Sequence, residues 1–139
     1  MTDATPETVI PAAPVAASED RLLPGIVYAL YLLGFSNGLT FIIGVILAHV
    51  QEGTAGPKMK SHYTFLIRTF WISAAGFLAA CAVFAVSIPL SFLLIGIPGL
   101  VVSGLFMGAI AIWFLVRTIV GLVYLARDEA YPRPNAWLV

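Results

Sequence analysis

The sequence has little charge and no excess of either sign. Asp, Glu, Lys and Arg make up 10% of the residues, with seven basic and seven acidic side chains and a net charge of zero. Ordinary globular domains carry about 25% charged residues. Because a neutral chain has no net electrostatic attraction for a polyanion, we expect no nucleic-acid partner.

Cysteine and metal-ligating residues are also scarce. The one cysteine, Cys81, excludes an intrachain disulfide and a cysteine-based metal cluster. His49 and His62 bracket a loop that contains Glu52, but this spacing matches no dense metal-binding motif. We therefore expect no metal and no cofactor. Cys81 is interpreted as a small packing residue, with a redox or lipid-modified thiol as the alternative.

Hydrophobic residues, by contrast, are abundant. They make up 60% of the chain, and the mean hydropathy is +0.99. Small soluble domains bury only about two thirds of the surface that they expose when unfolded. A soluble chain of 139 residues could not hide this much apolar surface. The sequence therefore predicts an all-α integral membrane protein whose main partner is the lipid bilayer.

Three apolar segments follow one another, and we predict one transmembrane helix in each, within a domain of residues 24–127. They cover about residues 24–50, 63–94 and 99–125. A helix over residues 24–50 would be roughly 40 Å long, which exceeds the hydrocarbon core of about 30 Å. The GFSNG stretch at residues 34–38 could instead break the first segment into a re-entrant hairpin. We favour a single crossing, because lipid does not tolerate exposed irregular backbone.

The two ends of the chain differ from this apolar domain. Residues 1–23 are acidic and interrupted by prolines, which excludes a signal peptide and predicts a disordered tail. Residues 128–139 contain Pro132 and Pro134 in an x-Pro-x-Pro pattern, which favours an extended C-terminal tail.

The basic residues predict an orientation. With three crossings, the first loop and the C-terminus share one side, and six of the seven basic residues lie there. The positive-inside rule makes that side cytoplasmic. We therefore expect a multi-pass protein of the bacterial inner membrane, with a periplasmic N-terminus and a cytoplasmic C-terminus.

The stretch SHYTFLIRTFW, residues 61–71, marks the entry into the second apolar segment. His62 is expected in the loop, and Arg68 is expected near the cytoplasmic interface, where snorkelling relieves the cost of a charge in lipid. Tryptophan favours the same interface. The boundary or lipid-headgroup candidates are Lys58, Lys60, Arg68, Trp71, Arg117 and Trp137.

The same stretch carries a family resemblance, together with a C-terminal block, RTIVGLVYLARDEAYPRPNAWL. Over roughly residues 26–138 the chain resembles a family of small bacterial membrane proteins similar to the Tic-twenty subunit of the chloroplast import translocon. The resemblance implies a membrane domain and no chemistry. Leu66 departs from the pattern, where a polar residue is expected. The positions that match the family motif are His62, residues 67–70 with Arg68, Thr69 and Phe70, then Arg117, Gly121 and Tyr131 to Pro134 with Pro132.

Small residues at helical spacing suggest surfaces for helix packing. Gly34 and Gly38 form one GxxxG motif, and Gly104 and Gly108 form another. Such spacing lets two helix backbones approach closely. Asn37 is a strong polar group near the middle of the first segment, and we expect it to hydrogen-bond between helices. These contacts could lie within the chain, between copies in a homo-oligomer, or with other membrane subunits.

The expected function is non-enzymatic, with no catalytic residues. The acidic residues all lie in the tails or the loop, so no paired carboxylates occur at one membrane depth. Ion and proton pathways usually need ionisable residues within the membrane. We therefore expect a scaffold or an accessory subunit of a membrane complex. The alternative is an oligomeric transport or protein-translocation component, as the plastid relatives suggest.

Overall fold

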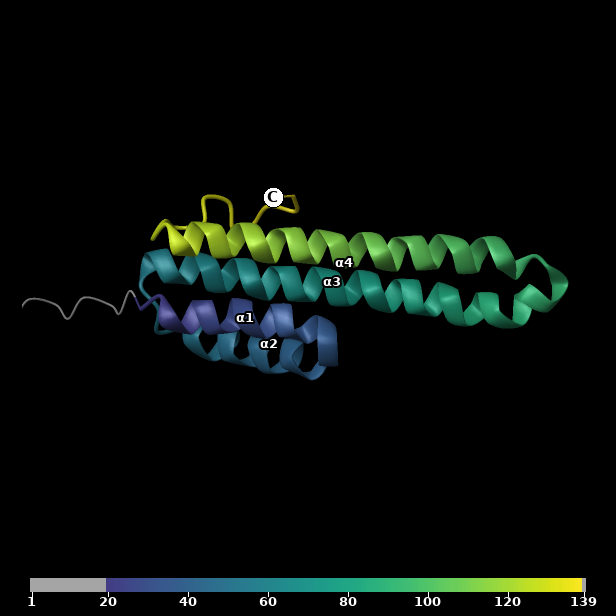
Figure 1. The fold of residues 1–139 in the computed structure, drawn as a ribbon, viewed down its shortest axis with the longest axis horizontal. Coiled ribbons are helices and arrows are strands. Elements are labelled where there is room, and N and C mark those ends of the chain that lie inside the picture. Colours follow the sequence, from purple (N-terminus) through teal and green to yellow (C-terminus); the bar gives the residue numbers. More distant parts are fainter. Residues whose placement is uncertain (1–19, 139) are drawn as a thin grey trace, which may run out of the picture.

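The computed structural model describes residues 20–138, and its regular secondary structure in that range is helical, with two antiparallel pairs of helices (Figure 1). Two long helices, α3 and α4, run side by side. A shorter pair, α1 and α2, packs against one half of their length. The elements are α1 (Leu22–Asn37), α2 (Leu39–Glu52), α3 (Pro57–Leu90), the short 3₁₀ helix η1 (Ser91–Leu93) and α4 (Gly96–Ala126).

The two long helices are apolar enough and long enough to cross a membrane. Their 34 and 31 residues give lengths of about 51 and 46 Å. The helix predicted over residues 99–125 agrees with α4. The one predicted from residue 63 begins earlier, at Pro57, because proline suits the first helical turn and Gly56 before it is extended. The prediction that His62 lies in a loop is therefore wrong.

The first apolar segment is two helices, so the prediction of one helix over residues 24–50 is wrong. Gly38 has a φ of +71°, a backbone conformation that ends α1 and turns the chain back into α2. The Ser36 hydroxyl donates to the Leu33 carbonyl, and the Asn37 side-chain oxygen accepts from the Thr40 N–H. The polar residues of GFSNG thus satisfy the backbone of a turn.

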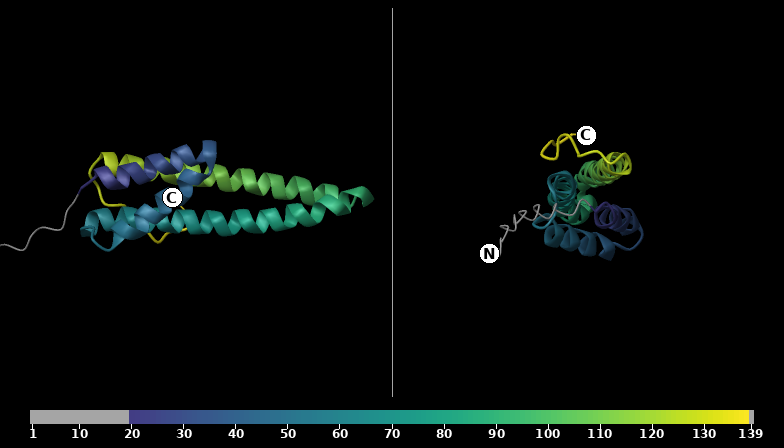
Figure 2. Two further views of the ribbon diagram at one scale, coloured as in Figure 1. Left: turned by 90° about the horizontal axis from the view of Figure 1, so that it is seen from below. Right: turned by 90° about the vertical axis from the view of Figure 1, so that its left-hand side faces the viewer.

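This hairpin also changes the predicted orientation. Because α1 and α2 return to the level where they began, the start of α1, the start of α3 and the end of α4 lie together (Figures 1 and 2). The Asp128 carboxylate lies 3.3 Å from Lys58 Nζ and 3.7 Å from Arg21 Nε. The N-terminal and C-terminal sides of the described chain therefore lie at one end of the molecule, an arrangement that the predicted three crossings do not have. We call this shared end the charged end.

The opposite end of the long pair, the distal end, carries no charge. From Thr69 to Val116 the sequence contains no Asp, Glu, Lys, Arg or His. The chain turns there at Leu94, whose φ is +60°, and the neighbouring Phe92 is 89% exposed. Beyond the tip of the α1–α2 hairpin, both long helices expose apolar side chains, so nothing in the described chain covers their distal halves.

The C-terminal segment, residues 127–138, is not helical and folds back over the charged half of α3 and α4 (Figure 1). It is more closely packed than a free extended tail, because Tyr131 is buried and its ring stacks on Phe65 with centroids 3.8 Å apart. The disordered tail predicted over residues 1–23 falls largely on residues 1–19, outside the described part. Residues 22 and 23 belong to α1.

Candidate functional site

A cluster of polar side chains is buried where α1, α3, α4 and the C-terminal segment meet. Each element contributes at least one residue, and each member is at most 4% exposed. Buried polar groups are costly unless they are hydrogen-bonded, so their partners determine what the cluster does. We call it the polar cluster, and its members are Tyr28, His62, Thr69, Arg117 and Tyr131.

His62 connects two segments that are far apart in sequence. Its Nδ1 lies 3.1 Å from the Tyr28 hydroxyl oxygen, and its Nε2 lies 2.9 Å from the Glu129 carbonyl oxygen. A carbonyl can only accept, so Nε2 carries the proton and Nδ1 accepts from the Tyr28 O–H. The neutral imidazole thereby joins α1 to the C-terminal segment through α3.

Arg117 is fully buried and holds the end of the C-terminal segment. Its Nε donates to the Thr69 hydroxyl at 3.0 Å, and its Nη1 lies 3.0–3.1 Å from three successive carbonyl oxygens, those of residues 136–138. Its Cζ lies 4.2 Å from the ring centroid of Phe65 and 4.8 Å from that of Trp113. Cation–π contacts of this kind add to the hydrogen bonds. The Arg117 guanidinium, which we named as a boundary or lipid-headgroup candidate, is therefore engaged within the protein.

Other contacts to the C-terminal segment also use its backbone. Arg68 Nη2 donates to the Asn135 carbonyl at 3.1 Å, and the Tyr131 N–H donates to the Ser61 hydroxyl at 2.9 Å. Burial raises the pKa of Tyr131, and the Arg117 guanidinium opposes that rise. The segment is thus held by a series of backbone hydrogen bonds and by one stacked aromatic ring.

Gly121 makes room for the cluster. A Cβ at this position would collide with the Tyr28 hydroxyl oxygen and with the Tyr28 ring. The Tyr28 and Tyr31 side chains reach from α1 to the long helices. Tyr28 lies against Gly121 of α4, and the Tyr31 hydroxyl donates to the Leu66 carbonyl of α3 at 3.1 Å. The small residue at 121 is therefore what allows α1 to lie close to α4.

Four of the positions quoted for the family resemblance, His62, Thr69, Arg117 and Tyr131, thus belong to one cluster, and Gly121 adjoins it. The chain matches no family model, no curated protein and no solved structure. The Tic-twenty-like resemblance stays a prediction. The convergence of these positions is a property of this fold, whatever family the chain belongs to.

The remaining predicted site residues lie apart from the polar cluster. Trp71 and Trp137 are exposed, Phe70 packs beside the Tyr31 ring, and Pro132 is exposed in the C-terminal segment. Lys58 pairs with Asp128, while Lys60 is exposed beside it on the first turn of α3. These lysines, like Arg68, lie toward the charged end.

The two glycine motifs have different surroundings. Gly34 is buried against the Phe41 ring inside the α1–α2 hairpin, and Gly38 forms its turn. Gly104 and Gly108 face open space, because a methyl carbon added at either position would have no neighbouring atom of the described chain within 4 Å outside its own helix turn. Asn37 serves the turn: its bond with the Thr40 N–H joins the end of α1 to the start of α2, and within the described chain it makes no hydrogen bond to α3 or α4.

Sequence reasoning missed the tyrosines that complete the cluster. Tyr28 and Tyr31 are three residues apart on one face of α1, and their hydroxyls stand in an otherwise apolar segment. That spacing was a usable signal, because a buried tyrosine usually has a hydrogen-bond partner for its hydroxyl. Phe65 and Trp113, which stack on Arg117, had no such signal.

The chemistry open to the polar cluster is limited by its own bonds. Both nitrogens of His62 are engaged, so either could act on another molecule only after its present bond opened. Among residues 20–138, no three His, Cys, Asp or Glu side chains gather in a way that could hold a metal ion. The arrangement is suited to joining α1, α3, α4 and the C-terminal segment into one unit.

Proposed function

We propose that this protein is a non-enzymatic integral membrane protein, a scaffold or an accessory subunit of a membrane complex. In this proposal α3 and α4 cross the bilayer as a pair, and the α1–α2 hairpin enters from the charged end and penetrates part of the way. One observation carries the proposal: the distal halves of α3 and α4 are apolar, uncharged and uncovered by the described chain.

Lengths support the crossing. Residues 69–90 of α3 and 96–116 of α4 each form about 31–33 Å of helix without a charged residue. This matches a hydrocarbon core of about 30 Å. All seven basic residues then lie at the charged end, which the positive-inside rule makes cytoplasmic. A bacterial inner membrane is the setting that we propose.

The exposed surface supports the accessory role. Two crossing helices enclose almost no interior, so a solute pathway cannot lie within one copy. Side chains such as Leu105 and Val102 are free to contact lipid or the helices of another subunit. Hydrogen bonds hold the charged half of the protein together, and no described segment covers the distal half. Such a protein is suited to presenting its distal half to a partner.

Photo-crosslinking in the native membrane tests this role. A photoreactive amino acid at Leu105 or Val102 should give a discrete adduct with a different polypeptide. The matched control is Lys60, exposed at the charged end, where the same group should give no such adduct. Crosslinks to lipid alone from both distal positions would contradict the accessory role.

Self-association is the second candidate, and one observation favours it. Gly104 and Gly108 lie on the bare part of α4 with open space in front of them, and paired glycines of this spacing allow close helix contact. An oligomeric transport or translocation component would give adducts at multiples of the chain's own mass. Replacing Gly104 by Ile would abolish those adducts and leave adducts with another polypeptide unchanged.

A further inference from the structure

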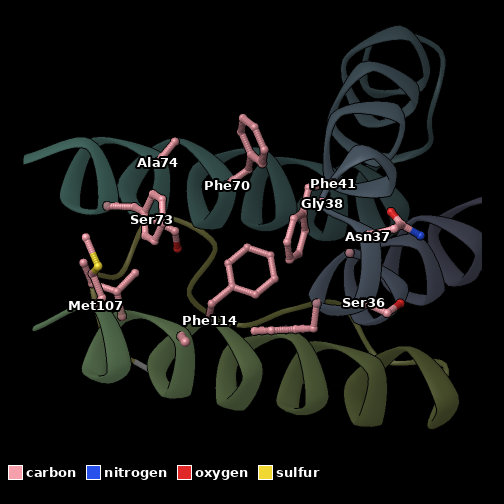
Figure 3. A pocket seen from close by; sticks show the side chains of 14 residues that line it. Ser36, Asn37, Gly38, Phe41, Phe70, Ser73, Ala74, Met107 and Phe114 are labelled. Carbon is pink, nitrogen blue, oxygen red and sulfur yellow. The ribbon is translucent and has the colours of Figure 1, made fainter. Parts of the chain in front are cut away.

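Two cations lie just beyond an apolar cavity at the tip of the α1–α2 hairpin. The cavity wall includes Phe70, Met107 and Phe114 and contains no charged residue (Figure 3). Toward the charged end, Arg68 of α3 precedes Phe70 by two residues, and Arg117 of α4 follows Phe114 by three. Both arginines donate to carbonyl oxygens of adjacent residues in the C-terminal segment, so the two guanidinium groups lie close together.

Neither guanidinium is neutralised by a carboxylate of the described chain. The ion pairs there join Asp128 to Arg21 and to Lys58, and none involves Arg68 or Arg117. Each of the two arginines also has one buried nitrogen without a hydrogen-bond partner, Nε of Arg68 and Nη2 of Arg117. These two nitrogens are enclosed by protein, so they add to the uncompensated charge and not to the contact surface. A cation beside hydrocarbon is costly unless it is paired, and an anion next to the two arginines would lower that cost.

The charged end as a whole has the same imbalance. Residues 20–138 contain seven basic and four acidic side chains, an excess of three positive charges. All of them lie outside the uncharged stretch from Thr69 to Val116. Basic residues beside a membrane surface attract anionic lipids, and basic pockets between membrane helices bind their headgroups. The ligand chemistry that fits this end is therefore a phosphate on a lipid.

Arg68 is the member of the pair that such a ligand can reach. Its side chain is half-buried, and its hydrogen bond to the Asn135 carbonyl lies at the surface. Arg117 is fully buried beneath the C-terminal segment, so it contributes its charge and no contact. In the proposed membrane placement, Arg68 immediately precedes the stretch of α3 that spans the hydrocarbon. Its guanidinium therefore extends to the level of the lipid headgroups.

We propose that Arg68 and Arg117 form a binding site for the phosphate of an anionic phospholipid at the cytoplasmic boundary of the membrane. The phosphate oxygens accept hydrogen bonds from the Arg68 guanidinium, whose planar fork matches their geometry. The buried charge of Arg117 adds an attraction that a single interfacial arginine lacks, because buried charges are screened less than exposed ones. The glycerol end of the lipid lies against the exposed Trp71 ring, one turn further along α3. This site rests on the proposed membrane placement, which brings headgroups to Arg68.

Native mass spectrometry of the full-length protein tests the site. The protein is released from vesicles that contain equal amounts of phosphatidylglycerol, which is anionic, and phosphatidylethanolamine, which has no net charge. We expect the wild type to retain one phosphatidylglycerol in preference to phosphatidylethanolamine. Arg68→Gln should reduce that preference by roughly fivefold, as expected for the loss of one positive charge beside the membrane surface. Arg127→Gln removes the same charge at an exposed position after α4 and should leave the preference nearly unchanged.

Two further measurements test the buried charge and the source of the phosphate. Arg117→Gln should weaken the preference for phosphatidylglycerol although Arg68 is still present, and an unchanged preference would overturn the paired site. Arg68→Gln, at a half-buried position, keeps the test informative if circular dichroism shows that Arg117→Gln does not fold. Excess inorganic phosphate should not displace the lipid, and displacement would assign the site to a free anion instead.

The remaining outcomes overturn the proposal in different ways. Equal retention of both lipids by the wild type would mean ordinary headgroup contact and no site, with the membrane placement unaffected. An equal loss of preference in Arg68→Gln and Arg127→Gln would mean a diffuse attraction of the whole charged end. Failure of the protein to float with the vesicles, together with the absence of any bound lipid, would overturn the membrane placement and the lipid site together.

Discussion

The Tyr28 hydroxyl oxygen lies 3.1 Å from Nδ1 of His62, and both side chains are fully buried. Tyr28 is on α1 and His62 is on α3, so this bond attaches the short hairpin to the long pair. Because the other imidazole nitrogen bonds to the Glu129 carbonyl, the same ring also holds the C-terminal segment. One histidine therefore fixes three parts of the chain at the charged end.

Replacing Tyr28 by Phe removes the donor to His62 and leaves its Nδ1 unsatisfied. We expect a loss of about 1–3 kcal/mol in the free energy of unfolding, measured by denaturant titration in mild detergent. The control is Tyr124→Phe, because Tyr124 is partly buried and its hydroxyl bonds to no described residue. If His62→Leu has the same effect in the wild type and in Tyr28→Phe, the two residues do not interact and the assignment is wrong.

Replacing Arg117 by Lys should release the end of the C-terminal segment. Lysine keeps the charge but cannot make the same fork of hydrogen bonds or stack on Phe65 and Trp113. We expect faster hydrogen exchange in residues 128–138, with little change in the distal halves of α3 and α4. Arg127→Lys, at an exposed position one residue after α4, should leave exchange unchanged. Unaltered protection in Arg117→Lys would show that the segment is held by something else.

Gly121→Ala and Gly108→Ala are the same substitution on the same helix with opposite expected effects. At Gly121 the added methyl meets the Tyr28 ring, and we expect a destabilisation of about 1–3 kcal/mol from overpacking. At Gly108 the methyl meets open space, and the better helix propensity of alanine should stabilise by up to about 1 kcal/mol. Thermal unfolding in detergent distinguishes them, and equal shifts in Tm would contradict the packing of α1 on α4.

The position of the chain ends can be tested by labelling single cysteines in a Cys81→Ala background. We expect Asp20→Cys, Lys60→Cys and Glu129→Cys to react with a membrane-impermeant maleimide from one side of the membrane. Phe92→Cys, at the distal turn, should not react from that side. Reaction of Asp20→Cys and Glu129→Cys from opposite sides would mean that the first apolar segment crosses the membrane after all.

Parts of this fold could be read from the sequence, and the reasons differ between elements. The extent of α4 was largely predictable, because residues 99–126 contain no proline and only one charged residue, Arg117. The start of α3 was less so, because Lys58 and Lys60 look like a polar loop although they continue the helix that Pro57 begins. The break at Gly38 was visible as a possibility. The break is stabilised by packing of the resulting hairpin against α3 and α4. Such a tertiary contact cannot be read from the local sequence.

The candidate site was harder to anticipate. His62, Arg117 and Tyr131 could each be singled out, but each was interpreted as belonging to a loop, an interface or a tail. Their meeting depends on pairs such as 28 with 62 and 62 with 129, which are far apart in sequence and set by how the hairpin and the C-terminal segment fold back. No local spacing encodes contacts of that range.

The uncharged stretch between Arg68 and Arg117 has a consequence for biogenesis. If α3 and α4 cross a bilayer, their insertion carries no ionised side chain through the hydrocarbon, since the distal turn exposes Phe92 and its apolar neighbours. The pair can then enter as a preformed loop from the side on which it is synthesised, without a hydrophilic domain to export. Such a chain should insert independently of the membrane potential, because it translocates no charge for that potential to act on.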